Sequence, residues 1–85
     1  MAVTTGTIQE LNLFETFCCV KMLRTDDTIS YLLLWSYGPS QEDNAKNRLL
    51  HGMFLSLARD AHVNGRTVRL THDSGSSLVT AMAVE

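Results

Sequence analysis

The fold is decided by the segment between residues 17 and 37, which reads FCCVKMLRTDDTISYLLLWSY. Residues 17–24 and 29–37 are rich in the aromatic, β-branched and large apolar side chains that strands favour. The residues between them, Thr25 to Thr28, include two aspartates and are typical of a turn. The segment therefore predicts a β-hairpin whose second strand is the most apolar part of the chain.

A long amphipathic helix is predicted after the hairpin, over about residues 41–62. Its apolar residues recur at the spacing of one helix face: Leu49, Leu50, Met53, Phe54, Leu57, Ala58 and Ala61. Ser40 followed by Asp43 resembles a capping box at the start of the helix. Asn64 and Gly65 tolerate the left-handed conformation that ends many helices, so the helix is expected to stop before them.

Three further strands are predicted outside these two elements. Residues 7–13 alternate imperfectly between apolar and polar side chains, with a bulge expected near Gln9 and Glu10. Residues 66–71 alternate cleanly, and residues 77–84 end in small alanines that allow another element to approach closely. The expected element order is three strands, one helix and two strands (βββαββ).

The composition is that of a small folded domain. The 85 residues are 45% apolar and 19% charged, which excludes a disordered segment and a coiled coil and favours one domain over residues 1–85. A net charge of −2, with seven Lys and Arg, argues against a domain that binds phosphate backbones. Neither a signal peptide nor an apolar run of membrane-spanning length is recognised, so we expect a cytoplasmic protein.

The element order and the length resemble the OB-fold, a five-stranded, partly open Greek-key barrel with a helix between strands three and four. The expected fold class is therefore α+β, mainly β. The chain is also similar to the receptor-binding B subunits of bacterial A-B toxins in these segments: Leu49-Leu50, Phe54-Leu55-Ser56-Leu57-Ala58, Asn64-Gly65 and Val68-Arg69-Leu70. This resemblance implies a non-enzymatic subunit that forms a pentameric ring and binds a carbohydrate or protein partner. The separated disulfide pair usual in that family is absent, and no glycan-binding residue is carried over.

The pairing within the hairpin depends on whether its loop has an even or an odd number of residues. An even-numbered loop places on one face, as a barrel interior, Cys18, Val20, Met22, Ile29, Tyr31, Leu33 and Trp35. The opposite face then carries more Leu and Phe than exposure to water explains, which favours burial against other copies of the chain. The expected oligomer interface comprises Phe17, Cys19, Leu32 and Leu34 on that face, with Arg48, Leu55 and Arg59 on the polar side of the helix. An odd-numbered loop would change these pairings.

Two aromatic residues are candidates for ligand binding. Trp35 and Tyr37 lie on one face near the end of the second hairpin strand, where an OB-fold stacks sugars or bases. The simpler interpretation is that both rings belong to the core. In the ligand-binding interpretation, Arg69, one of the few cations on the strands, completes the candidate site. Single-stranded nucleic-acid binding is the alternative function, and the acidic loops weaken it.

No arrangement of side chains predicts catalysis, a metal site or a cofactor. His51 and His62 are eleven residues apart, about three helical turns, and cannot share one ion within a chain. His72 and Asp73 share a short turn with nearby serines, without a recognisable nucleophile elbow. The sequence therefore predicts a non-enzymatic module whose partners are copies of itself and a protein or carbohydrate ligand.

Overall fold

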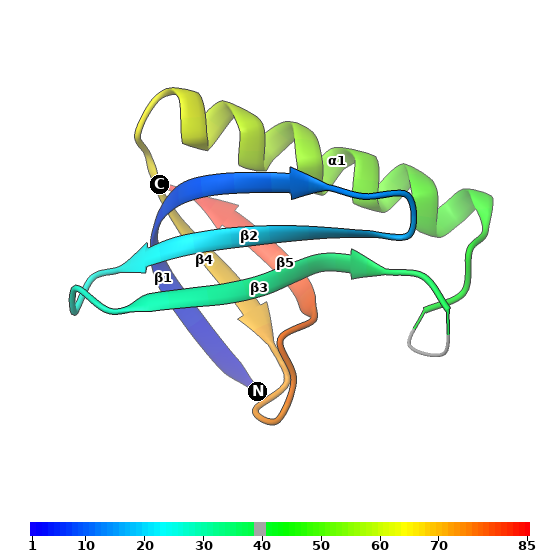
Figure 1. The fold of residues 1–85 in the computed structure, drawn as a ribbon, viewed down its shortest axis with the longest axis horizontal. Helices are drawn as coiled ribbons and strands as arrows, with labels where there is room; N and C mark the ends of the chain where they lie inside the picture. Colours follow the sequence, from blue (N-terminus) through cyan, green and yellow to red (C-terminus); the bar gives the residue numbers. More distant parts are fainter. Residues whose placement is uncertain (39–40) are drawn as a thin grey trace.

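Five strands and one helix follow one another in the expected order in the computed structural model, which describes residues 1–38 and 41–85 (Figure 1). Their bounds are β1 (Ala2–Leu13), β2 (Phe17–Arg24), β3 (Ile29–Ser36), α1 (Ala45–Val63), β4 (Thr67–His72) and β5 (Val79–Val84). β1 is longer than predicted because its first half pairs with β4 as well.

The strands form one antiparallel sheet in the order β3-β2-β1-β4-β5. The sheet curls until its outer strands meet at one point, where the Leu33 N–H donates to the Ser77 carbonyl at 2.9 Å and Leu33 forms an isolated parallel bridge with Leu78. One bridge does not close the sheet into a barrel. The structure thus confirms an α+β fold, a five-stranded sheet and a helix between β3 and β4.

β1 changes its neighbour along its length, and this change shapes the sheet. Residues 2–7 pair with β4, and residues 6–13 pair with β2. The register of β1 against β2 shifts between Ile8 and Glu10, which confirms the predicted bulge. Figure 1 shows the result, since the two blue halves of β1 run in different directions.

Three residues, 25–27, lie inside the hydrogen-bonded pair Arg24 and Thr28 that closes the hairpin, so the loop is odd-numbered and the register is not that of an even-numbered loop. The Arg24 N–H donates to the Thr28 carbonyl at 2.8 Å, and the Asp27 N–H donates to the Arg24 carbonyl at 2.9 Å. Asp27 is left-handed, with a φ of 67°, as is common in the last position of such a loop. Val20 consequently pairs with Leu32, not with Leu33.

This register reverses the predicted faces of β3. Leu32 and Leu34 are buried in the core, whereas Ile29 and Tyr31 are exposed. The prediction of an inward-facing Ile29, Tyr31 and Leu33 is therefore wrong, because a shift of one residue turns each side chain to the other face of the sheet. Trp35 is nevertheless buried opposite Cys18, since a register shift between Cys18 and Cys19 restores its inward direction.

α1 begins at Ala45, later than predicted, and Asn44 is its N-cap. The Asn44 side chain accepts a hydrogen bond from the Asn47 N–H at 2.8 Å. Ser40, the predicted capping residue, lies outside the described residues. The helix ends close to the expected position, where Gly65 is left-handed with a φ of 63°.

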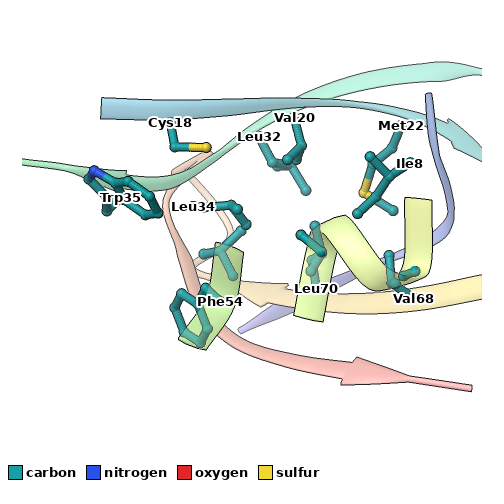
Figure 2. Close-up of a cluster of buried hydrophobic side chains, with 13 residues drawn as sticks. Ile8, Cys18, Val20, Met22, Leu32, Leu34, Trp35, Phe54, Val68 and Leu70 are labelled. Atoms are coloured by element: carbon teal, nitrogen blue, oxygen red, sulfur yellow. The ribbon is translucent and has the colours of Figure 1, made fainter. Parts of the chain in front are cut away.

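The core lies between the inner face of the curled sheet and α1. Figure 2 shows side chains from both converging on this interior. The largest fully buried side chains are Met22, Leu34, Leu70, Val20, Val68, Val79 and Cys18. α1 contributes Phe54 and two alanines, Ala58 and Ala61, whose small side chains let the helix approach the strands closely.

Candidate functional site

An aromatic cluster joins the end of β3 to the first half of α1; it consists of Trp35, Tyr37, His51 and Phe54. The His51 ring stacks on Trp35, with centroids 5.5 Å apart and an interplanar angle of 11°, and its centroid lies 5.9 Å from that of Phe54. The Nδ1 atom of His51 lies 2.9 Å from the Tyr37 hydroxyl oxygen. Trp35 is 7% exposed and His51 is 3% exposed, so the cluster serves mainly to attach α1 to the sheet.

The exposed rim of this cluster is formed by Tyr37 and Arg48. The guanidinium carbon of Arg48 lies 5.5 Å from the centroid of the Tyr37 ring, within the range of a cation–π contact. Arg48 also donates to the Asp43 carboxylate at 2.7 Å and lowers the pKa of Asp43. A sugar or base would therefore meet Tyr37 and Arg48 and little of Trp35.

Arg69 does not extend this rim. It is exposed on β4, where its Nε lies 3.3 Å from a carboxylate oxygen of Glu85. β4 is separated from β3 by two strands in the sheet order, and Arg69 faces solvent whereas Trp35 faces the core. The structure thus brings Trp35 and Tyr37 together, 6.4 Å between ring centroids, but leaves Arg69 elsewhere.

Most of the strand residues predicted to form an oligomer interface are buried or half-buried against other residues of the same chain. Leu32 and Leu34 are buried, so their assignment to an interface is wrong; the odd-numbered hairpin loop turns them inward. Phe17 is half-buried and stacks on Phe14, with ring centroids 4.4 Å apart. Cys19 is also half-buried. Of this predicted surface, Phe17 and Cys19 remain partly exposed, and Phe17 lies beside Phe14, which was not predicted there and is 52% exposed.

The helix residues also differ from the prediction, because α1 is rotated about its axis. Leu55, which was assigned to the polar side, is half-buried against the core, and His51 is buried as well. Each residue of a helix is turned by 100° about the axis relative to the one before it. On this scale, the middle of the buried side of α1 lies roughly a quarter turn from the middle of its apolar residues. Two specific partners explain this rotation: the Tyr37 hydroxyl for His51 and the stacked Trp35 ring.

The rotation leaves an unpartnered apolar surface on α1, which we call the α1 apolar face. It consists of Leu49, Leu50, Met53 and Leu57, which are 67%, 45%, 57% and 45% exposed. These residues were predicted to lie in the core. One signal was available in the sequence: the apolar arc from Leu49 to Ala58 covers about half of the helix circumference, wider than the roughly 100° stripe that suits packing on one side.

A hollow of about 520 Å³ lies on α1 beside the α1 apolar face, lined by Gly52, Leu55, Ser56, Arg59, Asp60 and Val63. Of the predicted interface residues, Leu55 and Arg59 lie here. The lining comes from one helix, with a single cation and a single carboxylate. It therefore provides little for a small-molecule site, which typically has a few converging polar groups from several elements.

The cysteines and the remaining histidines have structural partners. Burial raises the pKa of Cys18 to about 11, and burial together with the Glu10 charge raises that of Cys19, so neither is an activated thiolate. His72 Nδ1 donates to the Ser76 carbonyl at 2.8 Å, and His62 Nδ1 donates to the Ile8 carbonyl at 2.7 Å. Across residues 1–38 and 41–85, no three His, Cys, Asp or Glu side chains are placed to hold a metal ion.

Comparisons with protein-family models, with curated proteins and with solved structures give no match. In the described part of the chain, no helix is both long enough and apolar enough to span a membrane. Among the described residues, the α1 apolar face is the largest group of exposed large apolar side chains on neighbouring turns of one element.

Proposed function

We propose that this chain is a non-enzymatic, OB-fold-like module that associates with copies of itself through the α1 apolar face. The observation that carries this proposal is the exposure of four large apolar side chains on neighbouring turns of one helix. Single exposed apolar residues are normal, but contiguous apolar patches mark surfaces that another molecule covers.

Burial of this face between two copies would contribute favourable free energy to association. Complete burial of a leucine or methionine contributes roughly 1.5–3 kcal/mol, and about half of each side chain remains to be buried here. Four such residues on each copy therefore offer several kcal/mol, from which the entropy of association is subtracted. A reversible, concentration-dependent complex is the expected result.

The OB-like architecture is supported by the Leu33–Leu78 bridge, which joins the two ends of the sheet order as the closure of a small barrel would. The resemblance to toxin B subunits favours a ring of five copies. In such an assembly, the rim of Tyr37 and Arg48 is the surface that offers an aromatic ring and a cation to a protein or carbohydrate ligand.

The test is the molar mass in solution of the wild-type chain and of Leu57→Asp, measured by sedimentation velocity over a concentration series. Wild type is expected to exceed the 9.5 kDa of one chain, whereas a carboxylate within the α1 apolar face should reduce the mass to that of a monomer. Because Leu57 is exposed, the variant should keep the circular dichroism spectrum of the wild type.

Tyr31→Asp is the matched control, because Tyr31 is 60% exposed on β3, away from the helix. It should associate as the wild type does. Dissociation by Tyr31→Asp and not by Leu57→Asp would place the contact on the sheet and overturn the assignment to α1. A wild-type chain that is monomeric at every concentration would overturn the proposed function itself.

A further inference from the structure

Two opposite charges bracket the α1 apolar face. Lys46 precedes Leu50 by four positions and Asp60 follows Leu57 by three, so both project from the same side of the helix as the face. Both residues are exposed. The ion pairs formed within the described residues involve neither of them; the Asp60 carboxylate accepts only from the neutral Asn64 amide, at 3.2 Å.

Both charges also oppose the dipole of α1. Lys46 is the second residue of the helix, where the positive end of the dipole favours an acidic side chain, and the first turn holds no acidic residue. Asp60 is in the last turn, where a cation is favoured. Each charge therefore makes the isolated helix less stable. A partner outside the chain that pairs with both would explain their signs and their positions.

Apart from Leu50, whose counterpart is Ser56, the face and its two charges are symmetric about Met53, with the sign of the charge inverted. Lys46 and Asp60 lie seven residues before and after Met53, and Leu49 and Leu57 lie four residues before and after it. Seven residues correspond to about 10 Å along the helix. An antiparallel copy of the same helix therefore places Lys46 opposite Asp60 and Leu49 opposite Leu57. A parallel copy would instead bring like charges together.

We propose that the partner of the α1 apolar face is the α1 helix of a second copy, packed antiparallel across a two-fold axis at Met53. The inference rests on the proposed function and specifies its contact. The two ion pairs at the ends set the direction of the helices, and the four apolar side chains of each copy fill the space between them. Figure 1 shows the strands along one side of α1, and the second helix approaches the α1 apolar face, about a quarter turn around the helix from that side.

The size of this contact sets its strength. Lys46 and Asp60 are about 21 Å apart along the axis, so the contact is a narrow strip at the small end of protein interfaces. The pair is a dimer that forms reversibly with rising concentration. A single ring of five has no two-fold axis, so in this respect the inference departs from the toxin-like ring and predicts an even number of copies.

Charge reversal tests this pairing in the full chain. Lys46→Glu and Asp60→Lys are each expected to raise the dissociation constant of the dimer about tenfold, because each variant turns both ion pairs into repulsions. The double variant, Lys46→Glu with Asp60→Lys, should restore the wild-type constant. An equimolar mixture of the two single variants should also associate, because each then meets the opposite charge. Sedimentation velocity over a concentration series measures all five samples.

The folding of each variant is followed by thermal unfolding under dilute conditions. Lys46→Glu should not lower the unfolding temperature, because the new carboxylate agrees with the helix dipole. Equal constants for all variants, or loss of association in the double variant as well, would overturn the antiparallel pair. If the antiparallel pair is overturned but Leu57→Asp still dissociates the complex, the proposed association through the α1 apolar face stands with a different arrangement of the two copies. A mass of five copies would also overturn the pair.

Discussion

Gly6 lies where β1 is paired on both sides, with Arg24 of β2 and with Val68 of β4. A methyl group at this position would overlap the carbonyl oxygen of Leu23 and would lie 2.8 Å from the Arg24 Cα atom. The neighbouring atoms are backbone and cannot move aside without disturbing both ladders. The absence of a side chain at Gly6 thus allows β1 to cross from one partner strand to the other.

Gly6→Ala is therefore expected to lower the free energy of unfolding by about 2–4 kcal/mol, as overpacking against rigid neighbours does. Gly52→Ala is the matched control, because an added methyl group on this exposed helix position has no neighbour within 4 Å. It should raise stability by about 0.5–1 kcal/mol, since alanine favours a helix. Urea unfolding measures both, and equal effects of the two substitutions would contradict this account of Gly6.

α1 is the element in which local signals and packing differ most. Its N-terminus depends on the Asn44 side chain, which satisfies the Asn47 N–H, and its C-terminus on the left-handed Gly65. Its rotation depends on other elements, because His51 contacts Trp35 and Tyr37 of the β3 end. The ends of the helix are thus local properties, whereas the side that faces the core is not.

Asn44→Ala should reduce the free energy of unfolding by about 1 kcal/mol, the usual effect of removing an N-cap side chain. Asn44→Asp keeps an acceptor for the Asn47 N–H and places a negative charge at the positive end of the helix dipole. It should therefore be at least as stable as the wild type. Chemical denaturation of both variants decides the point; an alanine variant as stable as the aspartate variant would argue against capping by Asn44.

In the molecule as a whole, two histidines of α1 add polar contacts with the β1 and β3 region to the apolar packing of the helix on the sheet. His62 reaches the Ile8 carbonyl beside the β1 bulge, and His51 is enclosed by the aromatic cluster. The guanidinium group of Arg48 lies over the Tyr37 ring of this cluster. Burial lowers the pKa of His51, so the folded chain favours a neutral ring at this junction.

Stability should consequently depend on pH. The pKa of His51 in the unfolded chain is about 6.5. Below that pH the unfolded chain binds a proton at His51 that the folded chain resists, so the free energy of unfolding decreases from about pH 6.5 towards the lowered folded pKa. Thermal unfolding between pH 7 and pH 5 should show this decrease in the wild type. His51→Gln should flatten it, while His62→Gln, the control, should keep it.

Several features of this protein were readable from local patterns in the chain. The element order, the bulge after Ile8 and the end of α1 at Asn64-Gly65 all follow from neighbouring residues, through alternation, helical spacing and turn-forming side chains. The aromatic pair was also recognised, with burial in the core and a ligand-binding platform as the two interpretations. Such features need no knowledge of distant contacts, because the backbone conformation of a few residues produces them.

Packing between distant elements settled the rest. The side of β3 that faces the core depends on whether its hairpin loop holds an odd or an even number of residues, and one residue moved Leu32 and Leu34 from a predicted interface into the interior. The side of α1 that faces the core depends on the partners available to His51. The sides of β3 and α1 that face the core decide which apolar side chains remain exposed. Helical or strand periodicity alone does not show which side of an element faces the core.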